Sequence, residues 1–283
     1  MENQGNSNPN CSIYVITHKK VDEVDASDYK YLLVGAKKNN TFNNNYYLDN
    51  SGENISDYND SYCELTGLYW MWKNCNDDYI GLVHYRRLFA HVKPHMKLIG
   101  RYIVCSTKNS FSLLSSEEAR RILQTRELIV KRSEKRIRNT KKLFTEQIGE
   151  ELFCEIKSVL EKNYPEYMDS FYKVCRGHTH INCNMFVGRK NVIDSYCDWL
   201  FPLLQELDKN NELKTGSRFH NRELGYVAEL LFGIWIEKNT IDYETMDTVF
   251  IGDGMSVNSI IPLKKLLVFA IKKMKSRMQY EHK

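Results

Sequence analysis

Short apolar runs that end in polar residues recur along this chain and predict buried strands. A continuous run of about four to eight apolar residues is typical of a strand that is covered on both faces. Such runs lie at 12–17, 31–34, 80–83, 102–105 and 184–188.

Apolar residues at helical spacing predict helices between these strands. They occur at 60–74, 192–207 and 222–238, and Ser115 begins a further helix. Ser61 and Glu64 have the spacing of a capping box, and Pro202 predicts a kink. Polar loops are expected at 37–60 and 208–220. Because strands alternate with helices, we expect an α/β fold with a mainly parallel central sheet flanked by helices.

Charge is distributed unevenly along the chain, although the net charge is only +4. Residues 120–142 hold ten Lys or Arg against two Glu, a net of +8, and residues 264–283 carry +6. The remainder is therefore acidic, at −10. We expect a disordered N-terminus (1–11), one domain (12–250) with a mainly helical basic insertion (115–163), and a basic amphipathic tail (251–283).

Several classes of protein lack support in the sequence. The polar first ten residues do not have the apolar core of a signal peptide, and no apolar run approaches the roughly 20 residues that span a bilayer.

The eight cysteines include no C-x-x-C pair, which disfavours zinc and predicts reduced core thiols of a cytoplasmic protein. His178 and His180 could share a metal, but a solvated pair in a loop is the simpler interpretation. Glycine-rich nucleotide loops and a Gly-x-Ser-x-Gly elbow are absent from the sequence.

The segment His84-Tyr85-Arg86-Arg87, directly after an apolar run, is the strongest candidate for chemistry. Ligands of open α/β sheets bind outside the carboxyl ends of the strands. Two guanidiniums and an imidazole at such a place suit a phosphate or diphosphate, because the planar arginine fork binds anionic oxygens in pairs. A basic surface turn explains the same four residues equally well.

The predicted helix 222–238 offers a carboxylate. Arg222 and Glu229 are seven residues apart and lie two turns apart on one face, with Glu223 less well placed. Glu229 has apolar neighbours, and a partly buried carboxylate can serve as a general base. A structural ion pair is the alternative, and from the residues alone it is favoured.

Several motifs together resemble the bacterial capsular and exopolysaccharide-biosynthesis glycosyltransferase family, long described only as a domain of unknown function. The resemblance runs from about Ile13 to Asn239, and its most specific block extends from Asn54 to Arg87. The matching motifs are 54–56, 62–66, 69–70, 72–74, 80–87, 184–186, 196–201, Arg222, Gly225, Tyr226 and Glu229.

The resemblance implies a GT-A-like nucleotide-sugar-binding fold and transfer of a sugar to a growing surface polysaccharide. Some relatives are galactofuranosyltransferases, so UDP-galactofuranose is the leading donor. The implied mechanism is an inverting displacement in which Glu229 or Glu223, with Arg222 nearby, deprotonates the acceptor hydroxyl. Donor-binding candidates are Thr17, His18, Gly35, Ala36, Asn54, Tyr62, Glu64, His84, Tyr85, Arg86, Arg87 and Asn184.

Many GT-A enzymes carry Asp-x-Asp and a divalent ion where this chain has His84 to Arg87. We therefore expect Arg86 and Arg87 to neutralise the leaving UDP themselves, and no cofactor is assigned. Mn²⁺ or Mg²⁺ is an alternative that these residues do not favour.

The expected partners are a nucleotide sugar, a lipid-diphosphate-linked glycan and the inner membrane surface. The basic segments would hold the protein peripherally on the cytoplasmic face, although a C-terminal helix docked on the body explains the tail equally well. Nucleic acid is not expected, since residues 120–142 lack interleaved aromatic residues. A non-catalytic polysaccharide-assembly or binding protein with the same fold is the alternative function.

Overall fold

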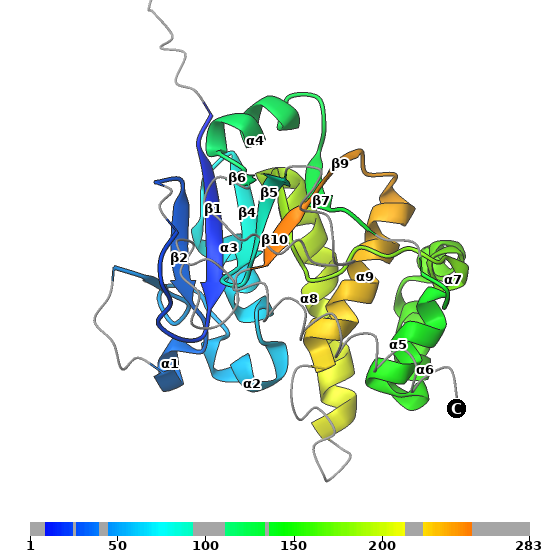
Figure 1. The fold of residues 1–283 in the computed structure, drawn as a ribbon. Coiled ribbons are helices and arrows are strands. Elements are labelled where there is room, and N and C mark those ends of the chain that lie inside the picture. Colours follow the sequence, from blue (N-terminus) through cyan, green and yellow to red (C-terminus); the bar gives the residue numbers. More distant parts are fainter. Residues whose placement is uncertain are drawn as a thin grey trace, which may run out of the picture.

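The computed structural model describes residues 9–24, 27–39, 45–92, 111–133, 136–212 and 223–250. The strand expected at 102–105, the tail 251–283 and Arg222 lie outside these residues. Strands and helices alternate around one central sheet, which confirms the predicted α/β class (Figure 1).

The strands of this sheet are mostly short and buried. They are β1 (Cys11–Thr17), β2 (Tyr29–Leu33), β3 (Tyr47–Leu48), β4 (Tyr79–His84), β5 (Arg87–Val92), β6 (Phe111–Leu113), β7 (Leu128–Lys131), β8 (Phe186–Arg189), β9 (Tyr243–Met246) and β10 (Thr248–Phe250).

The sheet is mixed, with a parallel part on one side. The order is β3-β2-β1-β4-β8-β7-β9, and the first four strands run parallel. β8 is antiparallel to both β4 and β7, whereas β7 and β9 are parallel. β5 folds back from β4 and pairs with β6 and β10. The carboxyl ends of β1, β2, β4 and β7 therefore meet at one edge, together with the amino end of β8.

Both faces of the sheet are covered, as the continuous apolar strands require. Tyr14 and Ile16 of β1 face the larger core, which the helices α3 and α5 to α9 share. Ile13 and Val15 face a second core, formed with α4 and β5. Side chains alternate across a strand, so each strand joins the two cores.

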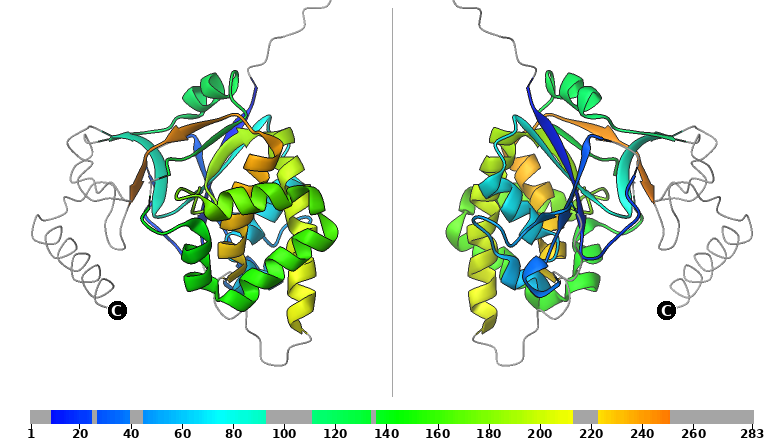
Figure 2. Two further views of the ribbon diagram at one scale, coloured as in Figure 1. Left: turned by 90° about the vertical axis from the view of Figure 1, so that its right-hand side faces the viewer. Right: turned by 90° about the vertical axis from the view of Figure 1, so that its left-hand side faces the viewer.

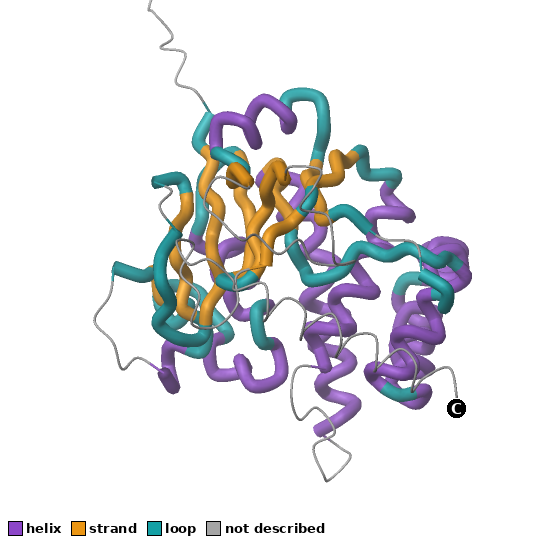
Figure 3. Tube along the Cα trace, viewed as in Figure 1, coloured by secondary structure: helices purple, strands orange, loops and turns teal. Residues whose placement is uncertain are grey.

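The helices gather mainly on one side of the sheet, as Figure 3 shows in purple. α5 to α7 lie against the outer side of α8 and α9 (Figure 2, left). The helices are α1 (Ala36–Asn39), α2 (Asn59–Tyr62), α3 (Leu65–Asn74), α4 (Ser116–Leu123), α5 (Thr140–Ile148), α6 (Glu150–Asn163), α7 (Met168–Arg176), α8 (Lys190–Glu212) and α9 (Glu223–Asn239).

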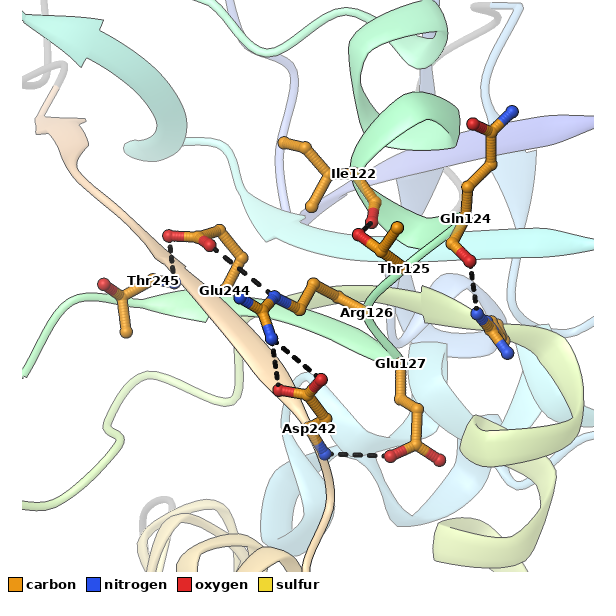
Figure 4. Close-up of polar contacts among 9 residues, drawn as sticks. Ile122, Gln124, Thr125, Arg126, Glu127, Asp242, Glu244 and Thr245 are labelled. Carbon is orange, nitrogen blue, oxygen red and sulfur yellow. Dashed lines mark hydrogen bonds and ion pairs between the residues drawn. The ribbon is translucent and has the colours of Figure 1, made fainter.

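The segment 115–163 is mainly helical, as expected, but it also contributes the strand β7 between β8 and β9. β9 was not predicted, and polar contacts hold it beside β7 (Figure 4). One terminal nitrogen of Arg126, Nη1, donates to both oxygens of the Asp242 carboxylate at 2.8 Å, and Glu127 accepts a hydrogen bond from the Asp242 amide. Part of the basic charge of this segment is thus paired with acidic residues of the same chain.

Local predictions succeeded at some helix ends and failed at others. Ser115 caps α4 by accepting a hydrogen bond from the Glu118 amide, as expected. The expected helix 60–74 is instead two helices, divided at Cys63, whose φ is +51°. The Ser61–Glu64 capping box does not form, since Glu64 makes no side-chain cap. α8 continues to Glu212, beyond the predicted start of a loop at 208.

Two further expectations concern the ends of the chain and its cysteines. β1 already begins at Cys11, the last residue of the expected disordered N-terminus. The described cysteines are free, and burial raises the pKa of the Cys175 thiol to about 12. Across the described ranges, no helix combines the length and apolar character needed to cross a membrane.

Candidate functional site

A cavity of about 270 Å³ lies at the edge where β4 and β7 end and β8 begins. Its wall is unusually rich in charged and polar side chains. The lining residues are Glu64, His84, Tyr85, Arg86, Arg87, Arg136, Gln147, His180, Asn182, Cys183, Gly225, Tyr226 and Glu229. Six of these were predicted site residues, so the structure brings together parts of the sequence that lie up to 165 positions apart.

The turn between β4 and β5 presents the basic motif to this cavity. His84 pairs with Arg87 across the turn, and the Tyr85 amide donates a hydrogen bond to the Ile16 carbonyl at the end of β1. The Arg86 guanidinium lies 4.9 Å from the centre of the Tyr85 ring, a cation–π distance. The turn thereby holds two guanidiniums at the edge of the sheet.

Two histidines lie at this turn: His84 belongs to it, and His18 packs against it. Nε2 of His84 contacts the Cys183 carbonyl, and since a carbonyl oxygen only accepts, this nitrogen carries the proton. The His18 ring meets the Tyr85 ring edge-on at 5.5 Å. His18 therefore touches a lining residue, although it does not itself line the cavity.

The segment before β8 supplies two asparagines in defined orientations. Asn184 has a φ of +45°, and its amide nitrogen donates to Glu64 Oε1 at 3.0 Å and to the Gly225 carbonyl at 2.9 Å. The buried Lys131 donates to Asn182 Oδ1 at 3.0 Å. Because lysine can only donate, Oδ1 is the acceptor in this pair, and the Asn182 amide nitrogen is left as the group able to donate toward the cavity.

Carboxylates enter the wall from α2–α3 and from α9. Glu64, released from the capping role that the sequence suggested, packs against Gly225, where an added Cβ would lie 3.3 Å from Oε1. Gly225 and Glu229 are one helical step of four residues apart, so both line the cavity from one face of α9. Glu223, the second candidate base, is half-buried in the first turn of α9 and is not part of the wall.

Seven lining residues were absent from the sequence-based list of site residues, and three of them come from segments to which no donor-binding or catalytic role was given. Arg136 follows β7, Gln147 belongs to α5, and His180 precedes β8. Arg136 lies within the basic segment 120–142, which was assigned to an external surface. His180 was considered only as half of a metal-binding pair, and its ring packs edge-on against Phe144 at 5.3 Å.

Other predicted donor-binding residues have structural partners instead. The amides of Gly35 and Ala36 donate to the fully buried Asp49 carboxylate at 2.9 and 3.0 Å. Thr17 Oγ1 bonds to the Lys19 backbone, and Asn54 bonds to the backbone of its own loop. Burial, with Asp208 nearby, raises the pKa of Tyr62. None of these side chains lines the cavity among the residues described.

A divalent cation is a poor match for the group of residues at the end of β4. Two guanidiniums repel a cation, and the described parts of the chain contain no cluster of three or more His, Cys, Asp or Glu suited to a metal. The three arginines against two glutamates leave the wall with a positive excess, which favours an anionic ligand.

The fold and the site define an α/β protein with an anion-suited cavity at the edge of its central sheet. The chain belongs to the family described as "Domain of unknown function (DUF4422)", which matches residues 12–240. Among solved structures it is similar to the apo structure of the WbbM bifunctional glycosyltransferase, with 26% identity and a TM-score of 0.76. That match covers 89% of this chain and 47% of the other, so the chain spans about half the length of this relative. None of the curated proteins matches.

Proposed function

We propose that the protein is a glycosyltransferase of bacterial surface-polysaccharide synthesis that uses a nucleotide-diphosphate sugar. The observation that carries this proposal is the cavity that unites Arg86, Arg87 and Arg136 with Glu229. Guanidiniums suit the diphosphate, and a carboxylate in the same cavity suits the deprotonation of an acceptor hydroxyl. The similarity to a bifunctional glycosyltransferase supports the same class of reaction.

The arginines would stabilise the negative charge that develops on the leaving diphosphate. In this role they replace the divalent ion that an Asp-x-Asp motif would hold. Activity should persist in excess EDTA. Loss of activity in EDTA that manganese restores would contradict the role given to the arginines.

The acceptor hydroxyl would attack the anomeric carbon directly, with inversion. Glu229 is the proposed base: it takes the proton of the hydroxyl while the bond from carbon to the diphosphate oxygen breaks. His18, directly after β1, is proposed to lie toward the nucleoside. UDP-galactofuranose remains the leading donor, and a lipid-diphosphate-linked glycan the leading acceptor.

Thermal shift measurements with UDP and a panel of UDP-sugars, with and without manganese, test this proposal. UDP should raise the melting temperature without manganese, and one UDP-sugar should be hydrolysed or transferred. If no UDP compound shifts the melting temperature, the proposed class is wrong. Binding without hydrolysis or transfer would instead favour a non-catalytic polysaccharide-binding protein.

We also propose that the basic tail 264–283 holds the protein on the cytoplasmic face of the inner membrane. Lysines and arginines near an anionic surface contribute on the order of 1 kcal/mol each. Deletion of 264–283 should release the protein from anionic lipid vesicles while UDP binding persists. Unchanged partitioning would contradict this role.

A further inference from the structure

A second hollow, which the proposed mechanism does not use, lies next to the cavity. It has a volume of about 700 Å³ and is bounded by α7, by the C-terminal half of α9, by the segment after β7 and by β9. This groove is lined by Arg132, Ser133, Lys173, Val174, Thr179, His180, Ile181, Gly233, Ile236, Glu237, Thr240, Ile241, Tyr243 and Thr245.

One face of α9 runs along both hollows. Gly225 and Glu229 line the cavity, and Gly233 and Glu237 line the groove. These four residues are spaced by four, so they form a single stripe in which neighbours are about 6 Å apart along the axis and which winds about 40° around the helix at each step. Glu229, the proposed base, is therefore the last residue of the stripe on the cavity side and lies one helical step before Gly233, the first on the groove side.

His180 connects the two hollows, since it lines both. Ser133, a groove residue, donates a hydrogen bond to the His180 carbonyl at 2.8 Å, and Phe144 packs on its ring. The position of His180 is thus fixed from both the backbone and the ring. A molecule in the groove would reach the cavity beside this histidine.

The chemistry of the groove suits a neutral, hydroxyl-rich ligand. Its charged groups are paired with each other or with close neighbours: Lys173 with Glu237, and Arg132 with Asp247 at 3.0 Å. Hydroxyls from Ser133, Thr179, Thr240 and Thr245 stand beside aliphatic Val174, Ile181, Ile236 and Ile241. Tyr243 is 40% exposed and adds an aromatic face with a polar tip.

We propose that this groove binds the acceptor as a neutral oligosaccharide, with its terminal hydroxyl directed past His180 to Glu229. The inference rests on the proposed function and assigns the acceptor side of the same reaction. It places the donor and the acceptor on opposite sides of the base along one helix. A general base must lie within hydrogen-bonding reach of the hydroxyl that it deprotonates, so the acceptor would have to extend past His180 into the cavity that Glu229 lines.

Gly233 offers a direct way to close the groove. An added Cβ there would meet only Val174 Cγ1 among the described atoms, at an ordinary distance of 3.8 Å. Gly233→Ala should therefore fold normally and serve as the matched control. Gly233→Leu should extend into the groove and obstruct it, and Tyr243→Ala tests the opposite wall without adding volume.

The test is saturation-transfer NMR on the full chain with maltotriose, cellotriose, mannotriose and N-acetylchitotriose, with UDP affinity measured on the same samples. At least one trisaccharide should give a signal with the wild type and Gly233→Ala, and Gly233→Leu should reduce it at least fivefold. Tyr243→Ala should also reduce it, whereas UDP affinity should stay within twofold in all variants. The inference is overturned if no trisaccharide binds, or if the signal survives both Gly233→Leu and Tyr243→Ala. Failure of UDP to bind would instead count against the proposed function.

Discussion

Two polar clusters occupy the same edge of the sheet, and they use their polar groups differently. Around Asp49, the carboxylate accepts hydrogen bonds from the Gly35 and Ala36 amides and from the hydroxyls of Ser56 and Thr66, at 2.6–3.0 Å. Asp49 is fully buried. Around the cavity, half-buried Arg86, Arg87 and Glu229 face open volume.

The difference shows that polar residues at strand ends do not by themselves mark a binding site. The Asp49 cluster follows β2, and the His84–Arg87 cluster follows β4, so both fitted the same rule from the sequence. What distinguishes them is burial and the presence of open volume. A fully buried carboxylate surrounded by its donors is structural, whereas half-buried guanidiniums that line a cavity can face a ligand.

Replacement of Asp49 should have the largest effect, and that effect should fall on stability. Asp49→Ala leaves two buried amides without their acceptor, which costs about 3 kcal/mol or more of the free energy of unfolding. Urea denaturation measures it, with Asp60→Ala as control, because the Asp60 side chain is 79% exposed and its ion pair with Lys38 lies at the surface. UDP affinity of the folded variant should be unchanged. A large loss of UDP affinity would mean that the Asp49 cluster belongs to the site.

Glu229→Gln should have the next largest effect, and it should fall on turnover. An amide cannot accept the proton of the acceptor hydroxyl, so turnover should fall at least about a hundredfold while the melting temperature changes little. Glu223→Gln is the matched control, because Glu223 lies on the same helix but outside the cavity wall. A near-normal rate in folded Glu229→Gln would reject Glu229 as the base. Loss of activity in Glu223→Gln alone would transfer the role to Glu223.

The sequence predicted four of the ten described strands and the central motif, because these depend on local pattern. Continuous apolar runs identified β1, β2, β4 and β8, and helical spacing identified α3, α8 and α9. The strands β3, β5, β6, β7, β9 and β10 escaped prediction, and β7 and β9 lie in strongly charged surroundings that interrupt the apolar pattern. The break at Cys63 depends on a positive φ that no residue pattern in 60–74 announces.

The cavity was only half predicted, for a different reason. Residues close to strand ends, such as His84 and Arg87, could be inferred from the order of apolar and polar positions. Arg136 and Gln147 reach the cavity because α5 and the segment before it fold back across the helices, and this depends on tertiary packing. Conversely, Gly35 and Ala36 appeared available because their partner, Asp49, lies 14 and 13 residues further on.

The smallest expected effect is a change in UDP affinity, and it should occur for the cavity cluster but not for the Asp49 cluster. Arg86→Lys keeps the positive charge but removes the planar fork and its stacking on Tyr85, so UDP should bind about tenfold more weakly, which is about 1.4 kcal/mol. Lys37→Met removes a whole charge near the Asp49 cluster, where Lys37 pairs with Asp57, and should leave UDP affinity within twofold. Isothermal titration calorimetry of both variants with UDP shows whether UDP affinity depends on the planar shape of the guanidinium or on the overall positive charge. Equal weakening by the two variants would mean that general positive potential, and not the guanidinium at the end of β4, attracts the diphosphate.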